Sequence, residues 1–408
     1  SESQERMMFT VKPEDVQTVL DRCDAWDVEA VAIGEVIKEK RNIVRFKGIE
    51  ILNLDLEFTT GGPVYNRPYN LPEIDNLEAV ELPDLPANLS QTIKDIISNP
   101  EVSSKDWVIR QYDHEVRGAT AIKPIQGKIG KEVHGDSSVL KPVENSWKGL
   151  ALTADVNPYL MEANPYHGTM SAVEEICRNL ASVGARIDSL ADCLCFGNPQ
   201  RPDIMGQFKS SCDALRDAAT SVDVPYVSGN VSLYNETAEG AIPPTPVLMG
   251  IGLVKDIRKC VTSDLKEKGS IWLVGKNKEQ MGASLYYRTM RIECPNVPTT
   301  DFDSFIPRME QLIDAIECGE VVACHDISTG GIALSVIEMC MSGVGAKIKL
   351  SGNMRADLEL FNESNGRWIV QVKPGREEKF SKRFDYAKEI GTVNDKINFA
   401  LNDNEKLE

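Results

Sequence analysis

The chain has 408 residues, of which 42% are hydrophobic, and carries a formal net charge of −17 at pH 7. This length predicts two to three domains of roughly 100 to 200 residues each. No apolar run approaches the roughly 20 residues that a bilayer crossing needs, and the acidic balance argues against a nucleic acid partner, because phosphate binding of that kind needs a basic face. Any phosphate-bearing ligand would therefore need local donors and a metal ion.

The cysteines indicate a reducing compartment. There are ten, without a C-x-x-C pair or regular spacing, which argues against a disulfide framework or a zinc site. Cys193 and Cys195 are one residue apart, a spacing that could suggest a metal, but we expect reduced thiols of a cytosolic core. With no signal peptide or membrane span visible, we expect a cytoplasmic protein.

The N-terminal 57 residues predict a strand, a helix, a second strand and a hairpin turn, in that order: residues 7–11, 13–26, 28–37 and 47–48. The helix depends on apolar residues that share one face at helical spacing, with Pro13 in the first turn. Residues 59–86 are rich in proline and glycine and show little periodicity. We expect this stretch to be a tether between domains.

Strands and helices alternate over the rest of the chain, which predicts α/β or α+β layers. The predicted helices are 89–97, a short one capped by 103–106, 168–183, 202–220, 304–317 and 331–341. The predicted strands are 120–122, 138–142, 149–154, 224–228, 271–274 and 321–323, followed by a last strand and helix that belong to a repeat. The long helix at 168–183 has its apolar residues at i, i+3 and i+4 spacing and stops at Gly184.

The repeat joins the two ends of the chain. Residues 1–13 align with residues 362–374 without a gap, and residues 33–36 recur as residues 390–393. The second copy closes a long segment, whereas the first copy opens the chain. We therefore expect the chain to be the back part of a larger tandem protein.

Two segments, 192–199 and 228–237, place glycine beside asparagine directly after an apolar stretch, and we expect both to be loops. Asp192 and Asn230 offer carboxylate and amide oxygens, which suit magnesium. The alternative is that both segments are ordinary turns with local side-chain bonds. A third loop, 325–331, opens a helix and could bind an anion, or it could be a capped helix start with Ser328 or Thr329 as the cap.

No catalytic dyad is visible among the four histidines, since none is paired with another at i+3 or i+4. His114 has an acid on either side, which could hold it protonated. The acid pair Glu174 and Glu175 lies on the long predicted helix. We expect this pair to be on a solvated face.

Several segments together resemble the second half of phosphoribosylformylglycinamidine synthase of the small-subunit type, which is also called synthetase subunit II. They occur in the order of that family and cover nearly the whole chain: residues 112–116, 135–139, 178–185, 192–199, 228–237, 243–246 and 325–331. Each motif alone is weak, whereas the set is specific. The family is a fused duplication of an A domain and a B domain, so the resemblance also accounts for the repeat.

The resemblance implies tandem A and B domains of the aminoimidazole ribonucleotide synthetase-like fold, of α+β or α/β class. Residues 1–57 would be the C-terminal part of a first B domain and residues 58–87 a linker. Residues 88–260 would be a second A domain with a nucleotide site, and residues 261–408 a second B domain. The A domain lacks its usual pairing partner, so we expect two copies of the chain to pair through it.

The implied activity is an ATP-dependent ligation in purine biosynthesis. Formylglycinamide ribonucleotide, ATP and glutamine-derived ammonia would give formylglycinamidine ribonucleotide, ADP and phosphate. Ammonia would come from a glutaminase subunit through a small bridging subunit. By this resemblance the cofactors would be ATP and Mg²⁺. Substrate would be bound by Glu2, Ser3, Gln4 and Ser232. Asp192 and Gly229 would contact ATP, and Asn230 would bind magnesium.

Two departures from the family pattern matter. The family usually has asparagine where Cys195 stands, and its catalytic histidine belongs to the first A domain, so that His114 corresponds to a non-catalytic counterpart. We therefore assign no catalytic residue and expect the chain alone to be inactive. The alternatives are a nucleotide-binding scaffold half, or a related aminoimidazole ribonucleotide or selenophosphate synthetase. Residues 234–236 and 243–246 favour the phosphoribosylformylglycinamidine synthase family over these related synthetases.

Overall fold

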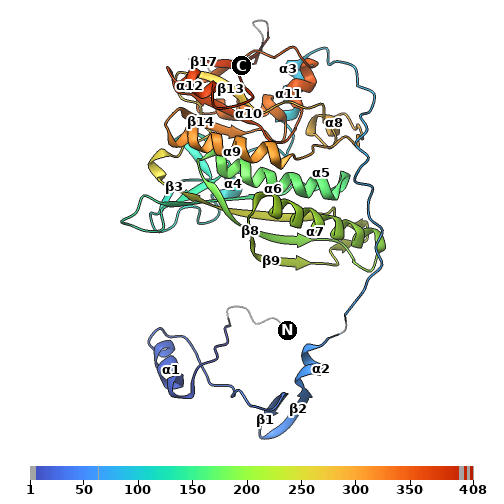
Figure 1. Ribbon diagram of the computed structural model, residues 1–408, viewed down its shortest axis with the longest axis vertical. Helices are drawn as coiled ribbons and strands as arrows, with labels where there is room; N and C mark the ends of the chain where they lie inside the picture. Colours follow the sequence, from blue (N-terminus) through green and yellow to red (C-terminus); the bar gives the residue numbers. More distant parts are fainter. Residues whose placement is uncertain (1–5, 63, 395–398, 402–404, 408) are drawn as a thin grey trace. The chain divides into compact units, whose positions relative to one another are not determined.

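The computed structural model describes residues 6–62, 64–394, 399–401 and 405–407, and it divides the chain into two units, Ser1–Asn66 and Arg67–Glu408. Figure 1 shows the elements of both units. No helix among the described residues has the length and apolar character to cross a membrane.

The first unit confirms the predicted helix and hairpin. Its elements are η1 (Pro13–Asp15), α1 (Val16–Asp24), β1 (Arg41–Phe46), β2 (Ile49–Asp55) and α2 (Leu56–Thr60). The strands expected at 7–11 and 28–37 are not formed. The repeat explains the first of these, because residues 7–11 align with 368–372, which form a central strand held by a neighbour on each side. Within the first unit, the described residues offer no such neighbours, and none of them is buried.

The second unit opens with α3 (Leu89–Ile97) and α4 (Asp106–Ile109) and then builds a six-stranded sheet in the order β3-β6-β7-β12-β8-β9. Its strands are β3 (Thr120–Ile122), β6 (Ser138–Leu140), β7 (Gly149–Asp155), β8 (Arg186–Cys195), β9 (Tyr226–Ser232) and β12 (Thr245–Val254). Strands β8 and β9 are parallel, and the other pairs are antiparallel. Two short hairpins lie outside this sheet: β4 (Ile125–Lys128) with β5 (Lys131–His134), and β10 (Glu236–Thr237) with β11 (Gly240–Ala241).

A seven-stranded sheet follows, in the order β14-β16-β13-β17-β15-β18-β19. Its strands are β13 (Ser270–Val274), β14 (Val321–Asp326), β15 (Gly345–Ile348), β16 (Trp368–Val372), β17 (Ala387–Asn394), β18 (Phe399–Leu401) and β19 (Glu405–Leu407). The accompanying helices are η2 (Ile257–Lys259), α8 (Leu285–Thr289), α9 (Phe302–Glu317), α10 (Gly331–Cys340), α11 (Ala356–Phe361) and α12 (Glu377–Ser381). The mixture of strands and helices confirms the expected fold class.

Helix α6 (Pro165–Ser182) is the element that joins the two sheets. It packs on β7 and β12 of the first sheet and against α9 and β14 of the second layer, while α5 (Pro158–Ala163) and α7 (Pro202–Val222) lie beside it (Figure 1). The side chain of Asn164 caps its start by accepting from the backbone N–H of His167 at 3.0 Å. Gly184, at φ 86°, ends it as predicted.

The loop predictions for residues 192–199 and 228–237 are wrong in the first half of each segment. Strand β8 continues through Cys195 and β9 through Ser232, so Asp192, Gly229 and Asn230 lie within paired strands. Polar residues and glycine fit here because β9 is an edge strand with mostly exposed side chains. The sequence pattern alone does not show that the two segments pair with each other.

Candidate functional site

Asp192 and Gly229 face each other across β8 and β9. A Cβ atom placed on Gly229 would lie 2.8 Å from Asp192 Oδ2, so the carboxylate covers the space that glycine leaves open. Partial burial raises the pKa of Asp192, and the backbone N–H of Asn230 opposes that rise by hydrogen bonding. The pair therefore presents one carboxylate beside bare backbone at the edge of the sheet.

Asn230 and Ser232 lie on the opposite face of the same strand pair. They are in register with Cys193 and Cys195, whereas Asp192 is in register with Gly229, and neighbouring residues of a strand point to opposite faces. The side-chain amide of Asn230 donates to Cys193 Sγ at 3.6 Å. Asp192 and Asn230 thus do not converge, and one ion cannot bind both side chains at once.

Glu2, Ser3 and Gln4 lie outside the described residues, but the repeat pairs them with Glu363, Ser364 and Asn365. In this second copy the loop is tied into the fold. Glu363 accepts from the backbone N–H groups of Leu285 at 2.9 Å and Gly330 at 2.8 Å, and burial raises its pKa to about 7.

The contact between Glu363 and Gly330 also shows how the start of the helix after the loop at 325–331 is capped. Helix α10 has Gly330 as its N-cap, at φ 81° and without a side-chain bond, so the alternative of a Ser328 or Thr329 cap is wrong. The backbone N–H of Gly330 has no partner within the helix and donates to the carboxyl group of Glu363. The positive end of the helix is thus already occupied by an internal carboxyl group.

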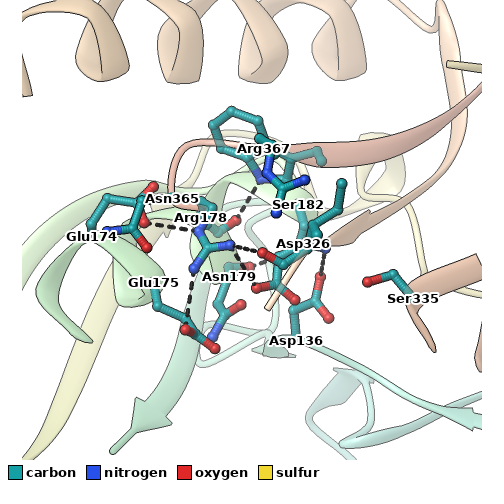
Figure 2. Close-up of polar contacts among 12 residues, drawn as sticks. Asp136, Glu174, Glu175, Arg178, Asn179, Ser182, Asp326, Ser335, Asn365 and Arg367 are labelled. Atoms are coloured by element: carbon teal, nitrogen blue, oxygen red, sulfur yellow. Dashed lines mark hydrogen bonds and ion pairs between the residues drawn. The ribbon is translucent and has the colours of Figure 1, made fainter. Parts of the chain in front are cut away.

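A buried charge cluster lies where α6 meets β14 (Figure 2). The guanidinium of Arg178, whose side chain is 2% exposed, lies 3.0 Å from Glu174, 3.1 Å from Glu175 and 3.3 Å from Asp326. The solvated face expected for this pair is wrong, because the second layer of the fold covers this side of α6: Glu174 is fully buried, and Glu175, 21% exposed, is paired with Arg178. The sequence did hold a signal, since Glu174 and Arg178 are at i and i+4 and are surrounded by apolar residues.

This cluster contains more carboxylates than cations. Burial raises the pKa of Asp155 and of Glu174 to about 7 and that of Asp326 to about 6, in each case against the attraction of Arg178. Arg367, also fully buried, donates to the carbonyl oxygens of Asn362 and Ser364 rather than to these acids. Part of the cluster is therefore protonated near neutral pH.

His325 continues the cluster on β14. Its Nδ1 lies 2.6 Å from Asp136 and its Nε2 lies 3.0 Å from Glu338, and the two carboxylates raise its pKa well above the ordinary value despite burial. Ligand atoms of Asp136, His325 and Asp326 lie within 4.8 Å of one another. The carboxylates suit a hard cation, whereas a histidine protonated on both nitrogens has no lone pair to offer.

Two cavities of the second unit bear on the site, and only the first is lined by residues of the charge cluster. One beside Arg178, of about 20 Å³, is lined by Asp155, Glu175, Ser328 and Glu363 among others, and has room for a single water but not for a nucleotide. The other, of about 510 Å³, has His114 in its wall together with two acids and four cations: Glu132, Asp264, Arg110, Lys123, Lys128 and Lys266. Its size suits a small molecule.

Two family descriptions match the chain. The "AIR synthase related protein, N-terminal domain" matches residues 134–254. The "AIR synthase related protein, C-terminal domain" matches residues 1–47 and 271–403, so one domain type occurs at both ends of the chain. This agrees with the internal repeat.

Several curated relatives of the chain are named phosphoribosylformylglycinamidine synthase subunit PurL. The protein of Thermoplasma acidophilum is 35% identical over 384 residues, which are 93% of this chain and 50% of that protein. The protein of Pyrococcus furiosus is 38% identical over 371 residues, 91% of this chain and 50% of that protein. The chain thus spans about half the length of the curated relatives it matches.

Solved structures share the fold. PurL of Thermotoga maritima complexed with ADP matches with a TM-score of 0.63 at 19% identity. The matched region is 94% of this chain and 54% of the Thermotoga maritima chain. The same protein complexed with FGAR has a TM-score of 0.61 at 14% identity, over 78% of this chain and 51% of its own.

Proposed function

The chain belongs to the AIR synthase related proteins, and from this we propose that it is part of an ATP-dependent ligase of purine biosynthesis. The ligase would convert formylglycinamide ribonucleotide, ATP and glutamine-derived ammonia to formylglycinamidine ribonucleotide, ADP and phosphate. The observation that carries the proposal is the match of 91% or more of the chain to relatives named phosphoribosylformylglycinamidine synthase subunit PurL. Because the chain spans about half of those relatives, we assign it nucleotide and substrate binding and no catalytic residue.

We propose that Asp192 and Gly229 contact ATP, that Asn230 binds Mg²⁺ and that Ser232 contacts substrate. The open backbone at Gly229 supports this, since a Cβ there would fill the space beside the carboxylate. An amide oxygen is a ligand type that magnesium accepts. As Asp192 and Asn230 lie on opposite faces, the nucleotide contact and the metal contact would be separate. We also propose that Glu2, Ser3 and Gln4 bind substrate, because they resemble the substrate-binding loop of the family.

For partners, we propose a glutaminase subunit and a small bridging subunit. A Thermotoga maritima structure named PurLQS, with a TM-score of 0.63 at 20% identity, supports an assembly of this type for that protein. We also propose a cytoplasmic location, which suits ten cysteines that are all free. We also propose a homodimer through the sheet edge at β9, because β9 has a partner on one side only among the described strands.

Calorimetric titration of Asp192→Ala with MgATP tests the site. Loss of the carboxylate that contacts ATP should abolish binding while the melting temperature stays the same, since a partly exposed side chain contributes little to the core. Asp188→Ala, an exposed acid on the same strand, is the matched control and should bind as the unaltered chain does. Unchanged affinity with a lower melting temperature would return Asp192 to a structural role.

The scaffold alternative is tested by turnover. ATP hydrolysis that depends on formylglycinamide ribonucleotide and ammonia should be absent from this chain by itself. Hydrolysis at the rate of a complete enzyme would contradict the lack of a catalytic residue, and the assignment would then move to His114 or His325.

A further inference from the structure

Cys193 and Cys195 bring two sulfur atoms together on the face of β8 that Asn230 and Ser232 also share. Their Sγ atoms are 3.9 Å apart, and both thiols are partly exposed and free. One thiol donates to the other, and the side-chain amide of Asn230 donates to Cys193 Sγ. All ten cysteines lie in the part of the chain that the structure describes, and among them only Cys193 and Cys195 have their sulfur atoms in contact.

The strand keeps this pair from closing into a disulfide. The side chains of residues i and i+2 stand side by side on one face of an extended strand, so their Cβ atoms are separated by about two residue rises of about 3.3 Å each, or about 6.6 Å. A disulfide needs Cβ atoms about 3.5 to 4.5 Å apart. The two side chains can therefore lean together far enough for their sulfurs to meet without bonding, and the dithiol remains available to a ligand.

The separation of the sulfurs fits one bridging ion. Two thiolates bound to a tetrahedral ion at a metal to sulfur distance of about 2.3 Å are about 3.8 Å apart, close to the separation observed here. We propose that Cys193 and Cys195 form a two-sulfur binding site for thiophilic ions, of which zinc is the model. This goes beyond the ligase function and does not depend on it.

Binding at this site exchanges protons for the ion. Zn²⁺ displaces one proton from each thiol, so two S–H bonds break, two Zn–S bonds form and two protons are released without any change of oxidation state. Two positions of the ion stay open to water or to another ligand, which makes the site exchangeable rather than structural.

Phenylarsine oxide tests the site, because a trivalent arsenical forms a stable ring only with two neighbouring thiols. Its arsenic takes both sulfurs, and its oxygen leaves as water with the two thiol protons. We expect one adduct per reduced chain by mass spectrometry, lost in Cys193→Ser and in Cys195→Asn. Cys318→Ser, which removes an exposed lone thiol, should keep the adduct.

Zinc titration against a chromogenic chelator gives the second readout. Each of the two site variants should weaken the tightest zinc binding by at least about tenfold, whereas Cys318→Ser should leave it unchanged. Thermal melts establish that every variant is folded. An arsenical adduct that persists in folded Cys193→Ser, or zinc affinity equal in all variants, would overturn the proposal.

Discussion

Arg178 of α6 holds its Nη1 atom 3.3 Å from Asp326 Oδ2 at the end of β14. One guanidinium thus joins the helix that covers the six-stranded sheet to a strand of the seven-stranded sheet. The same nitrogen donates to the backbone carbonyl of Ile327. Because both side chains are almost fully buried, the junction depends on charges that water does not screen.

Removing the cation should leave this junction strongly destabilised. We expect Arg178→Met to lower the free energy of unfolding by about 3–5 kcal/mol, since it strands the buried carboxylates of Glu174 and Asp326. Urea unfolding at pH 7.5 measures this. Arg216→Met, whose side chain is 67% exposed, is the matched control and should change stability by about 0.5 kcal/mol or less. Equal effects in the two variants would show that the buried pairing contributes nothing.

The same cluster should make stability fall as pH rises. The pKa of Glu174 is about 7 in the folded chain against an ordinary 4.5, so between these values the folded state holds a proton that the unfolded state releases. His325 acts in the same direction, because its contribution is lost as pH rises through its raised pKa. Asp136 has a lowered pKa, and its contribution is lost only at acidic pH.

We therefore expect the free energy of unfolding to be higher at pH 5.5 than at pH 8. Glu174→Gln should reduce this difference, since the amide does not titrate. Glu378→Gln, an exposed acid on α12, should leave the difference as it is. A pH profile that is flat in the unaltered chain, or identical in the Glu174 variant, would show that the cluster is not linked to folding.

The sequence predicts well what local chemistry determines. Helix α3 forms as predicted, with Asn88 capping it by accepting from the N–H of Gln91 at 3.0 Å, and α6 ends at Gly184. The repeat likewise pairs two real copies of one domain type. These features depend on residues within one or two helical turns, or on a comparison of the chain with itself.

What the sequence does not predict depends on distant partners. Arg178 is buried because Asp326, far along the chain, lies against it. Strands β4 and β5 were missed because their residues carry little alternation. The strand expected at 7–11 has the right pattern but no neighbour to pair with among the described residues. The placement of Asp192 and Asn230 on opposite faces follows from the register of β8 and β9, which no motif encodes.

Gly229→Ala tests the close approach at the candidate nucleotide contact. The new Cβ would lie 2.8 Å from Asp192 Oδ2, so the carboxylate must rotate or the strand must shift. We expect a loss of about 1–3 kcal/mol in the free energy of unfolding. The double variant Gly229→Ala with Asp192→Ala should recover most of it, because the obstructing oxygen is gone. Gly34→Ala, where no atom lies within 4 Å, is the control, and a double variant no more stable than Gly229→Ala would contradict the account.

The edge of the six-stranded sheet gives the last prediction. Among the strands that the structure describes, β9 pairs with β8 alone, and its Val227 and Val231 side chains are 63% and 52% exposed. It therefore offers backbone groups and apolar surface to another strand. We expect the chain to form a symmetric dimer at high micromolar concentration, and Val231→Lys to shift it toward monomer, since a charge on an edge strand opposes strand pairing. Light scattering over a concentration series measures both. Val143→Lys changes an equally exposed valine outside any strand and should leave the dimer intact. A strict monomer in the unaltered chain, or equal dissociation by both lysine variants, would move the contact away from β9.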